Sequence, residues 1–332
     1  MVSVELAKGN RFEAKPDESL LAAAQRAGIQ LSYSCKTGRC SSCKCKLISG
    51  ETGLLSHEAG LSVDEKLDGW ILSCVRYALN DIVIDAEDIS KKLLSEAKTL
   101  PCRINQIDFL ATDVVRVFLR FPPNSNFQFL PGQYVDVIGP GGVRRSYSLA
   151  NADLKNNLLE LHIRKVDGGI MSRYWFENAK NNDLLRIFGP LGTFFVRESK
   201  DIDLIFLATG TGIAPVKSIL ESMDNIPFNE QPRSVQIFWG GRSIEDLYLN
   251  FSKIFEKFKY TPVLSRGGTE WGGAKGYVQD ELLRSRKSFE NTVVYACGSI
   301  SMINSAKIKL TKAGLPDMNF YSDAFVSSSN VN

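Results

Sequence analysis

The sequence predicts a protein of three parts, multidomain α+β and α/β in class. Residues 1–92 alternate between apolar and polar in the period of strands around one helical stretch, which is typical of a small α+β module. Residues 101–200 hold short strand-like stretches between Gly and Pro turns, which predicts an antiparallel β-barrel. Over residues 201–332 strands alternate with helices, which predicts a parallel α/β domain. Residues 93–100 lack a strand pattern, so we expect a linker or a short connecting helix there.

The elements of the first module follow from its apolar pattern. Two strands are expected before residue 15, and a helix is expected from Leu20 to Ala27. Asp17 or Ser19 would cap this helix, and Gly28 would end it. Three later strands are expected at residues 43–48, 70–75 and 82–85. This order of elements is typical of a β-grasp fold.

Four cysteines in this module have a specific spacing. Four residues lie between Cys35 and Cys40, and two lie between Cys40 and Cys43. Cys74 follows after thirty more. The pattern C-x4-C-x2-C…C is that of the thiolates that hold a plant-type [2Fe-2S] cluster, with three ligands on one loop and a fourth that returns from a later strand. The alternative is four ordinary buried thiols or two disulfides.

Composition and charge narrow the possible functions. The chain has 332 residues, 40 basic and 37 acidic, and its net charge of +3 gives no reason to expect binding to nucleic acid or to an anionic membrane. No apolar run approaches the roughly eighteen residues of a membrane span, and the N-terminus lacks the pattern of a signal peptide. Seven cysteines, an odd number, suit a reducing compartment, so we expect a cytoplasmic protein. The only histidines, His57 and His162, are interpreted as structural.

Two motifs in the barrel region point to a bound cofactor. In Arg145-Ser-Tyr147-Ser148, arginine can neutralise a pyrophosphate, tyrosine can stack on a flavin, and the second serine can hydrogen-bond a ring nitrogen. Residues 168–172, Gly-Gly-Ile-Met-Ser, come before a helix expected over residues 173–179, and a helix N-terminus suits phosphate. The alternatives are ordinary strand surface and a capped turn without a ligand.

The last part carries two candidate nucleotide-binding segments. Gly210-Thr211-Gly212 lies between a predicted strand and a predicted helix, as a phosphate-binding turn does, although a tight turn without a ligand has the same pattern. Cys297 and Gly298 end another strand, where open α/β sheets bind ligands, and a core cysteine is the alternative. Helices are expected at residues 216–223, 245–258 and 302–313.

The order of these motifs along the chain is typical of a known group of proteins. It resembles ferredoxin-NAD(P) reductase-type flavoproteins that carry an N-terminal plant-type ferredoxin domain. Within that group it is most similar to CDP-6-deoxy-3,4-glucoseen reductases, which serve a pyridoxamine-phosphate-dependent sugar dehydrase in 3,6-dideoxyhexose synthesis. The stretches that carry this likeness are residues 145–151, 189–195, 270–276, 295–299 and 320–325. Reductases of ring-hydroxylating dioxygenases share much of the pattern.

The resemblance implies roles for particular residues. It implies a [2Fe-2S] cluster on the four cysteines, a flavin-binding barrel for FAD and a nucleotide-binding domain for NADH. The FAD residues would be Arg145, Tyr147, Ser148, Met171 and Ser172, and the nucleotide residues Gly210, Thr211, Gly212, Cys297 and Gly298. Ser148, Cys297 and Phe325 would act at the reacting rings, with Phe325 stacked on the isoalloxazine. Ser41 and Thr209 stand where the family usually has glycine.

These cofactors together imply an electron-transfer enzyme. A nicotinamide gives up two electrons together, a cluster accepts one at a time, and a flavin can do both, so the flavin belongs between them. NADH is expected rather than NADPH, although Arg242, just after Trp239, could hold a 2′-phosphate. The expected acceptor is a CDP-sugar 3-dehydrase. The alternatives are an oxygenase component and, in another class, a redox sensor or structural protein without turnover.

Overall fold

The computed structural model describes residues 1–92, 95–154 and 157–325. By its internal contacts the chain divides into two compact units, Met1–Leu93 with Ser322–Asn332 and Leu94–Tyr321. The first two residues of the expected linker, 93 and 94, lie outside the described residues. Strand β8 already begins at Lys98, so residues 98–100 belong to the longest strand of the barrel.

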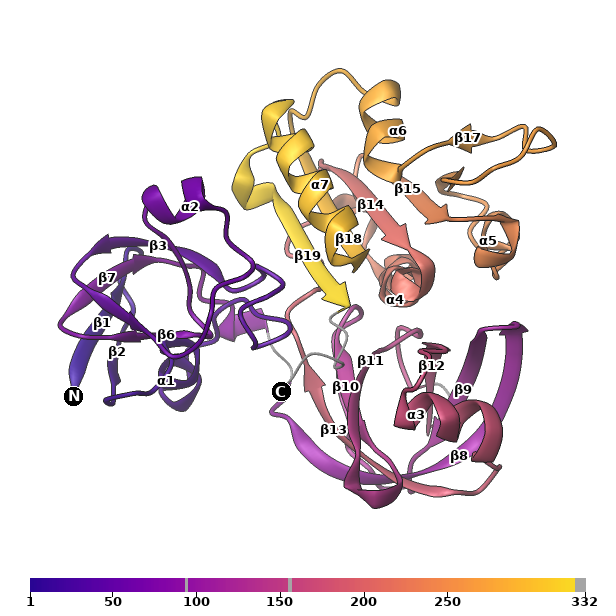
Figure 1. Cartoon of the computed structure of the whole chain (residues 1–332), viewed down its shortest axis with the longest axis horizontal. Helices are drawn as coiled ribbons and strands as arrows, with labels where there is room; N and C mark the ends of the chain where they lie inside the picture. Colours follow the sequence, from indigo (N-terminus) through magenta and orange to yellow (C-terminus); the bar gives the residue numbers. More distant parts are fainter. Residues whose placement is uncertain (93–94, 155–156, 326–332) are drawn as a thin grey trace. The chain divides into compact units, whose positions relative to one another are not determined.

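The first unit is built on a five-stranded sheet in the order β2-β1-β7-β3-β5 (Figure 1). Strands β1 and β7 are parallel, and the other neighbours are antiparallel. Strands β4 and β6 form a separate antiparallel pair. This mixed sheet with one main helix confirms the β-grasp prediction. The strands are β1 (Val2–Leu6), β2 (Arg11–Ala14), β3 (Lys44–Ser49), β4 (Thr52–Leu54), β5 (Trp70–Leu72), β6 (Arg76–Ala78) and β7 (Ile82–Asp85).

Helix α1 (Leu20–Arg26) supplies one side of the core of this unit. It begins after Ser19, whose hydroxyl accepts a hydrogen bond from the Ala22 amide at 3.1 Å, so Ser19 rather than Asp17 is the cap. Its apolar side chains pack with those of the sheet in one cluster. A second short helix, α2 (Val63–Leu67), has a capping box formed by Ser62 and Glu65.

The barrel of the second unit has six antiparallel strands in the order β11-β10-β13-β8-β9-β12. A bridge between Leu149 and Leu161 links the two end strands and closes the sheet, as the barrel prediction required. After β12 come helix α3 (Ile170–Arg173) and a π-helical turn, Tyr174–Asn178, so helical structure starts three residues earlier than expected. The strands are β8 (Lys98–Ala111), β9 (Val114–Arg120), β10 (Tyr134–Ile138), β11 (Arg144–Ser148), β12 (Leu158–Arg164) and β13 (Leu184–Leu191).

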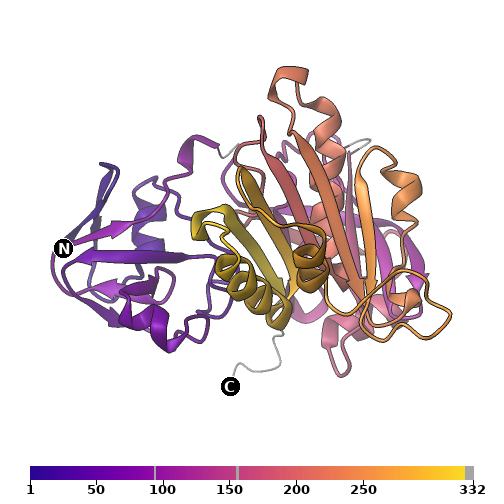
Figure 2. The ribbon, with the colours of Figure 1, turned by 90° about the horizontal axis from the view of Figure 1, so that it is seen from above.

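The rest of the second unit forms the predicted α/β domain, although residues 322–325 at the end of its last strand belong to the first compact unit (Figures 1 and 2). Its sheet has the order β17-β16-β15-β14-β18-β19, and the pairs from β17 to β18 are parallel. Strand β14 (Asp203–Thr209) lies inside the sheet, and helix α4 (Ile213–Ser222) follows it. The other elements are β15 (Ser234–Gly241), α5 (Phe251–Ile254), β16 (Lys259–Leu264), β17 (Ala274–Lys275), α6 (Val278–Ser285), β18 (Thr292–Ser299), α7 (Ile300–Lys312) and β19 (Phe320–Phe325).

The long helix expected over residues 245–258 is wrong. Only a 3-10 turn at Ile244–Asp246 and the single turn of α5 are helical there. Asp246 turns its carboxylate back to the Arg242 amide, and Asn250 caps a new helix by accepting from the Lys253 amide. Side chains that bond locally to the backbone end and restart helices, which the apolar period alone does not reveal.

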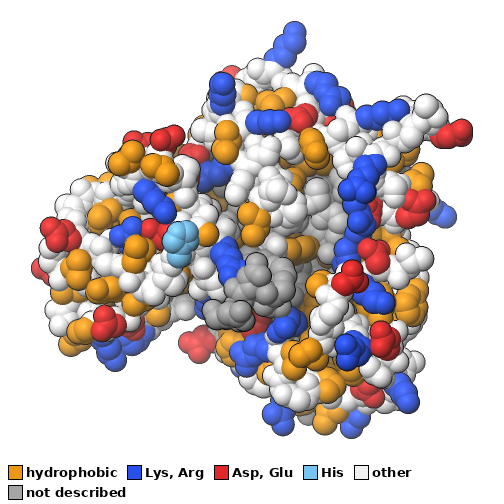
Figure 3. All heavy atoms as spheres, viewed as in Figure 1, with side chains coloured by type: hydrophobic (Ala, Val, Ile, Leu, Met, Phe, Trp, Pro, Cys, Tyr) orange, Lys and Arg blue, Asp and Glu red, His pale blue; other side chains and the backbone are white. Residues whose placement is uncertain are grey.

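Neither sign of charge dominates the chain, which has 40 basic and 37 acidic residues. Basic and acidic side chains are interspersed on the face that Figure 3 shows, in keeping with the net charge of +3. Within the described residues, no helix has the length and apolar character that crossing a bilayer requires.

Candidate functional site

The four predicted cluster ligands meet in the first unit as two pairs. The Cys35 amide donates to Sγ of Cys40 over 3.4 Å, and the Sγ atoms of Cys43 and Cys74 are 3.2 Å apart. Among the described residues, no three His, Cys, Asp or Glu side chains converge on a single ion. Two pairs of thiols are what a two-iron cluster requires, because each iron takes two protein ligands. The donor set therefore fits a [2Fe-2S] cluster.

The pairing also prepares these thiols to act as thiolates, the form that binds metal. A hydrogen bond with the Cys40 thiol lowers the pKa of Cys35 to about 5, and a hydrogen bond with the Cys43 thiol lowers the pKa of Cys74. The same bonds, with burial, raise the pKa of Cys40 and Cys43. Each pair thus has one group that ionises readily, and metal binding releases the remaining proton.

Ser41, which replaces the usual glycine of the family, adopts a left-handed backbone with φ of +59°. This conformation is unfavourable for a residue with a side chain. The Ser41 hydroxyl donates a hydrogen bond to the Gly60 carbonyl, and this bond ties the cluster loop to the segment before α2. The hydrogen bond offsets the backbone strain.

Substitutions of Ser41 should separate these two effects. Ser41→Ala keeps the strain and loses the hydrogen bond, so we expect the free energy of unfolding to fall by about 1 kcal/mol. Ser41→Gly loses both and should be nearly neutral, because relief of strain of about 1–2 kcal/mol offsets the lost bond and the greater freedom of glycine. Urea unfolding of the cluster-loaded protein, followed by visible circular dichroism, measures both. An alanine variant as stable as the glycine variant would contradict this explanation.

The R-x-Y-S motif lies at the end of β11. The register of β10 and β11 pairs Ser148 with Tyr134, and Ser148 is 7% exposed. The Tyr147 hydroxyl accepts a hydrogen bond from Nε1 of Trp175 at 3.0 Å, and the two rings meet edge to face. Burial raises the pKa of Tyr147 to about 12, so this phenol stays protonated and can donate. Arg145 is half-buried on the same strand.

Met171 and Ser172 lie in the first turn of α3, and both are buried. The Ser172 hydroxyl accepts a hydrogen bond from the Val166 amide at 2.9 Å, which closes the preceding turn. A hydroxyl that accepts one bond retains its own hydrogen, so Ser172 fits the role near a phosphate that the resemblance assigns to it. The Met171 sulfur fills space beside Gly139, where an added Cβ would lie only 2.5 Å away.

The predicted phosphate-binding turn, Gly210–Gly212, is a 3-10 turn that leads directly into α4. Its carbonyl at Gly210 accepts a hydrogen bond from Nε1 of the buried Trp239 at 3.0 Å. Gly212 lies so close to β18 that an added Cβ would be 2.3 Å from the Cys297 carbonyl oxygen. Backbone atoms cannot give way as a flexible side chain can, so this approach requires glycine. Thr211 between them is buried.

Thr209 occupies the second position where the family usually has glycine, and the structure accommodates it. Its backbone is extended, with φ of −131°, so no glycine is needed for conformation. Its hydroxyl accepts a hydrogen bond from the Ser299 amide at 3.2 Å, which joins the ends of β14 and β18. Gly298 makes room for it, because a Cβ at that position would lie 2.1 Å from the Thr209 hydroxyl oxygen.

The structure gives the positions of Cys297 and Phe325, two of the residues that are expected at the reacting rings. Cys297 is fully buried in the core of the α/β domain, two residues before the last residue of β18, and its carbonyl oxygen faces Gly212. Phe325 is the last residue of β19, and 39% of it is exposed. Their roles beside nicotinamide and flavin stay predictions.

Arg164, at the end of β12, is a functional candidate that the sequence analysis missed. Its Nη1 donates to Asp246 at 2.8 Å and lies 3.3 Å from Asp113. Its Nε and Nη2 are buried and have no hydrogen-bond partner within the described residues. An added Cβ on Gly210 would lie 3.7 Å from its Cζ, so these donors sit beside the turn that is predicted to bind phosphate. Unpaired guanidinium donors there suit an anion such as a nucleotide phosphate.

A buried polar network joins the barrel to α4. Nζ of Lys217 donates to the Ala150 carbonyl at 2.8 Å, to Glu160 at 2.9 Å and to Glu221 at 2.7 Å. Glu160 in turn lies 2.9 Å from Nε2 of His162. Because Ala150 follows the R-x-Y-S motif and α4 follows Gly210–Gly212, this network fixes the two motifs relative to each other.

His162 should make the stability of the second unit depend on pH. Burial lowers the pKa of its imidazole, and its ring nitrogens already bond Glu160 and Tyr248. An unfolded histidine binds a proton near pH 6.5, so below that pH the unfolded chain binds more protons than the folded one and stability falls. We expect the midpoint of thermal unfolding to drop between pH 7 and 5, and His162→Gln to lessen the drop. The matched control is the exposed His57→Gln, which should leave the drop intact.

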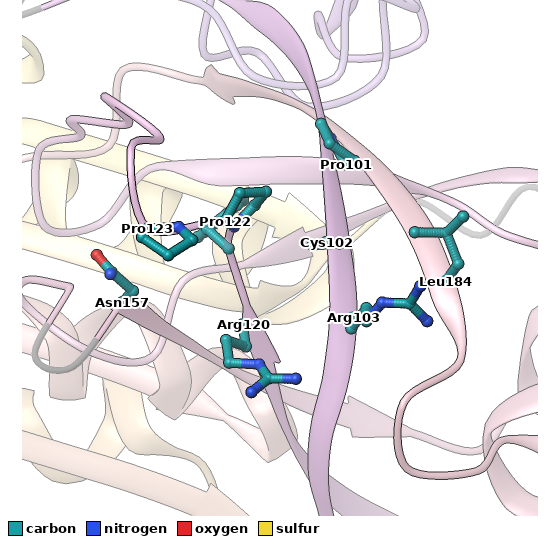
Figure 4. A pocket seen from close by; sticks show the side chains of 9 residues that line it. Pro101, Cys102, Arg103, Arg120, Pro122, Pro123, Asn157 and Leu184 are labelled. Atoms are coloured by element: carbon teal, nitrogen blue, oxygen red, sulfur yellow. The ribbon is translucent and has the colours of Figure 1, made fainter.

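One hollow on the barrel lies away from these motifs (Figure 4). It has a volume of about 340 Å³ and lies beside Leu184, the first residue of β13. The R-x-Y-S motif lies at the other end of β13, because Tyr134 pairs both with Ser148 and with Leu191, the last residue of that strand. Arg103 and Arg120 at its rim both donate to Asn182. We assign the hollow no role in the reaction.

The fold and the three sites together define an iron-sulfur flavoprotein oxidoreductase. Models of known domain families match in the same order: a 2Fe-2S iron-sulfur cluster binding domain at residues 4–79, an oxidoreductase FAD-binding domain at 101–196 and an oxidoreductase NAD-binding domain at 206–307. The cofactors predicted from the sequence, a [2Fe-2S] cluster, FAD and a nicotinamide nucleotide, are confirmed by these matches.

Individual relatives match over almost the whole chain. The CDP-6-deoxy-L-threo-D-glycero-4-hexulose-3-dehydrase reductase of Yersinia pestis is 40% identical, with 96% of each chain covered. Reductase component 1 of a terephthalate 1,2-dioxygenase from Comamonas sp is 31% identical, with 96% of this chain and 95% of that one covered. A cytochrome P450 reductase of Amycolatopsis has a crystal structure that is 27% identical, with a TM-score of 0.73 over 99% of this chain and 100% of that one. The chain belongs to the ferredoxin-NAD(P) reductase-type flavoproteins with an N-terminal plant-type [2Fe-2S] domain.

Proposed function

We propose that this protein is the NADH-dependent reductase of a pyridoxamine-phosphate-dependent CDP-sugar 3-dehydrase in 3,6-dideoxyhexose synthesis. One observation carries the choice of partner. The chain shares 40% identity over 96% of its length with a reductase named for such a dehydrase, against 31% for a dioxygenase reductase of equal coverage. None of the seven cysteines, all in the described part of the chain, forms a disulfide, which supports a place in the cytoplasm.

The reaction involves three sites, one each for the nicotinamide nucleotide, the flavin and the cluster. When bound, the nicotinamide supplies a hydride, the flavin takes up two electrons and releases them singly, and the cluster carries one electron at a time. Arg164 and Gly210–Gly212 would hold the nucleotide phosphates, since they combine unpaired guanidinium donors with a turn that admits no side chain at Gly212. Tyr147 and Ser148 would hydrogen-bond the flavin, and Lys217 keeps the two sites in register.

A coupled anaerobic assay tests this proposal. It contains the holoenzyme, NADH, a sugar 3-dehydrase of the pyridoxamine type and CDP-4-keto-6-deoxyglucose, with cytochrome c reduction in a parallel cuvette as the control for activity. We expect NADH to be consumed only when dehydrase and sugar are both present, and a 3,6-dideoxy sugar to form. Cytochrome c reduction without any turnover of the sugar would refute the choice of partner.

The second candidate is a reductase that supplies electrons to an oxygenase component. The 31% identity to a terephthalate dioxygenase reductase over nearly the full length favours it over any more distant role. The same preparation mixed with an oxygenase component, an aromatic acid and oxygen would then yield a dihydrodiol. A preparation that reduces neither cytochrome c nor a partner would instead favour the redox sensor or structural protein.

A further inference from the structure

The loop after β15 holds the two side chains best suited to bind a phosphate on the adenosine ribose, and both are already engaged by carboxylates. Arg242 donates through Nε and Nη2 to the two oxygens of Asp246, at 2.9 and 3.0 Å. The Ser243 hydroxyl donates to Glu245 at 2.5 Å. In open α/β sheets an acidic residue in this region bonds the 2′-hydroxyl of NAD, whereas an arginine accommodates the 2′-phosphate of NADP.

The carboxylate of Asp246 is well anchored. It is 8% exposed and also accepts hydrogen bonds from the Arg242 amide and from Arg164, so the arginine side chain meets it in a fixed geometry. Hydrogen bonds from Arg242 hold the pKa of Asp246 well below its usual range, so it remains ionised. With Asp113 beside both arginines, two guanidinium groups face two carboxylates, and the exposed Glu245 adds one more negative charge.

We propose that Asp246 and Glu245 make this site selective for NADH by occupying the groups that a 2′-phosphate would need. The proposal rests on the proposed function, because it places the adenosine ribose at the end of β15. A 2′-phosphate would bring its negative charge against Glu245, and it could recruit Arg242 only by drawing it from a buried carboxylate. Like charges repel, and a buried carboxylate that loses a partner is destabilised, so both effects oppose NADPH.

A second arrangement, in which Arg242 binds the 2′-phosphate, is also chemically reasonable, and an experiment can distinguish it from the proposed one. The Arg242 side chain is 58% exposed, so its outer edge could contact a 2′-phosphate while the inner edge stays on Asp246. In that arrangement Arg242 would favour NADPH, and its removal would weaken binding of any 2′-phosphorylated nucleotide. In the arrangement that we propose, the removal of Arg242 changes the affinity for a 2′-phosphorylated nucleotide only a little.

The test compares two probes that differ only in the 2′-phosphate, 5′-AMP and 2′,5′-ADP. Their dissociation constants are measured by calorimetry on the full-length, cofactor-loaded protein, with no turnover required. Glu245→Gln should tighten 2′,5′-ADP by about 3- to 10-fold with little effect on 5′-AMP, and Asp246→Asn should tighten 2′,5′-ADP relative to 5′-AMP by about tenfold or more. Arg242→Gln should leave 2′,5′-ADP within about twofold of the parent. Glu256→Gln, which removes an exposed carboxylate outside the loop, is the matched control.

The outcomes separate the two proposals. A loss of about tenfold or more in 2′,5′-ADP affinity for Arg242→Gln, or no gain for Glu245→Gln, overturns the selectivity proposal and leaves the proposed function standing. Failure of the parent protein to bind 5′-AMP or NAD⁺ at all overturns both. Because Glu245 and Arg242 are exposed, their variants keep the test decisive even if Asp246→Asn does not fold.

Discussion

Replacing Cys74 with serine is expected to abolish electron transfer from NADH to cytochrome c while NADH-dependent reduction of ferricyanide persists. Cys74 is the only predicted ligand outside the loop of residues 35–43, and its sulfur lies 3.2 Å from that of Cys43. Changes in outer-shell partners of metal ligands already lower metal affinity or activity by about 10- to 100-fold, so loss of a ligand should exceed that. The nucleotide and flavin motifs lie in the other compact unit, which should stay intact.

The matched control for this prediction is Cys45→Ala. Cys45 is as buried as Cys40 and Cys43 and lies only two residues from Cys43, but burial, followed by the negative charges of Glu58 and Asp85, raises its pKa to about 12, so it stays a thiol. Its variant should keep the visible absorption and paramagnetic resonance of the cluster. If Cys45→Ala lost the cluster and Cys74→Ser retained it, the ligand assignment would be wrong. Loss of ferricyanide reduction in Cys74→Ser would show that the two units are not independent.

The features predicted correctly are those encoded by neighbours in sequence. The [2Fe-2S] cluster was predicted from three cysteines within a loop of nine residues and one later cysteine, a spacing that the sequence displays directly. The cap at Ser19 is likewise local, since its hydroxyl bonds an amide three residues on. The alternation of strands and helices beyond residue 201 is also a pattern of neighbouring residues, and it correctly indicated the parallel sheet.

The features that were missed depend on residues distant in sequence. Arg164 reads as an ordinary strand residue until folding brings Gly210 and Asp246 to it, and only then do two of its donors lack partners. Thr209 departs from the glycine usual in the family, and the sequence does not show how it is accommodated, because the glycine that makes room for it, Gly298, lies on another strand. The broken helix around residue 250 is the exception, because there the Asp246 carboxylate bonds a backbone amide only four residues away, and the apolar period does not reveal such a bond. Periodicity carries none of this information.

Lys217→Met should strongly destabilise the second unit. Lys217 is 8% exposed, and its ammonium group donates to three acceptors, namely Ala150, Glu160 and Glu221. Removing it leaves Glu160, itself buried, beside a neutral imidazole, and a buried charge deprived of its partner costs about 3–5 kcal/mol. We expect a loss of that size in the free energy of unfolding, measured by urea denaturation with tryptophan fluorescence. Three of the four tryptophans, Trp175, Trp239 and Trp271, lie in this unit.

Two further variants decide whether the loss comes from the buried charge. Lys257 pairs with Asp224 on the surface, where the side chains are 48% and 68% exposed, so Lys257→Met should cost less than about 1 kcal/mol. The double variant Lys217→Met with Glu160→Gln removes both charges and should recover a large part of the loss, because an uncharged pair needs no counter-ion. A loss in Lys217→Met no greater than in Lys257→Met would mean that the barrel and α4 are held together by apolar packing. In that case the register of the flavin and nucleotide motifs would not depend on this network.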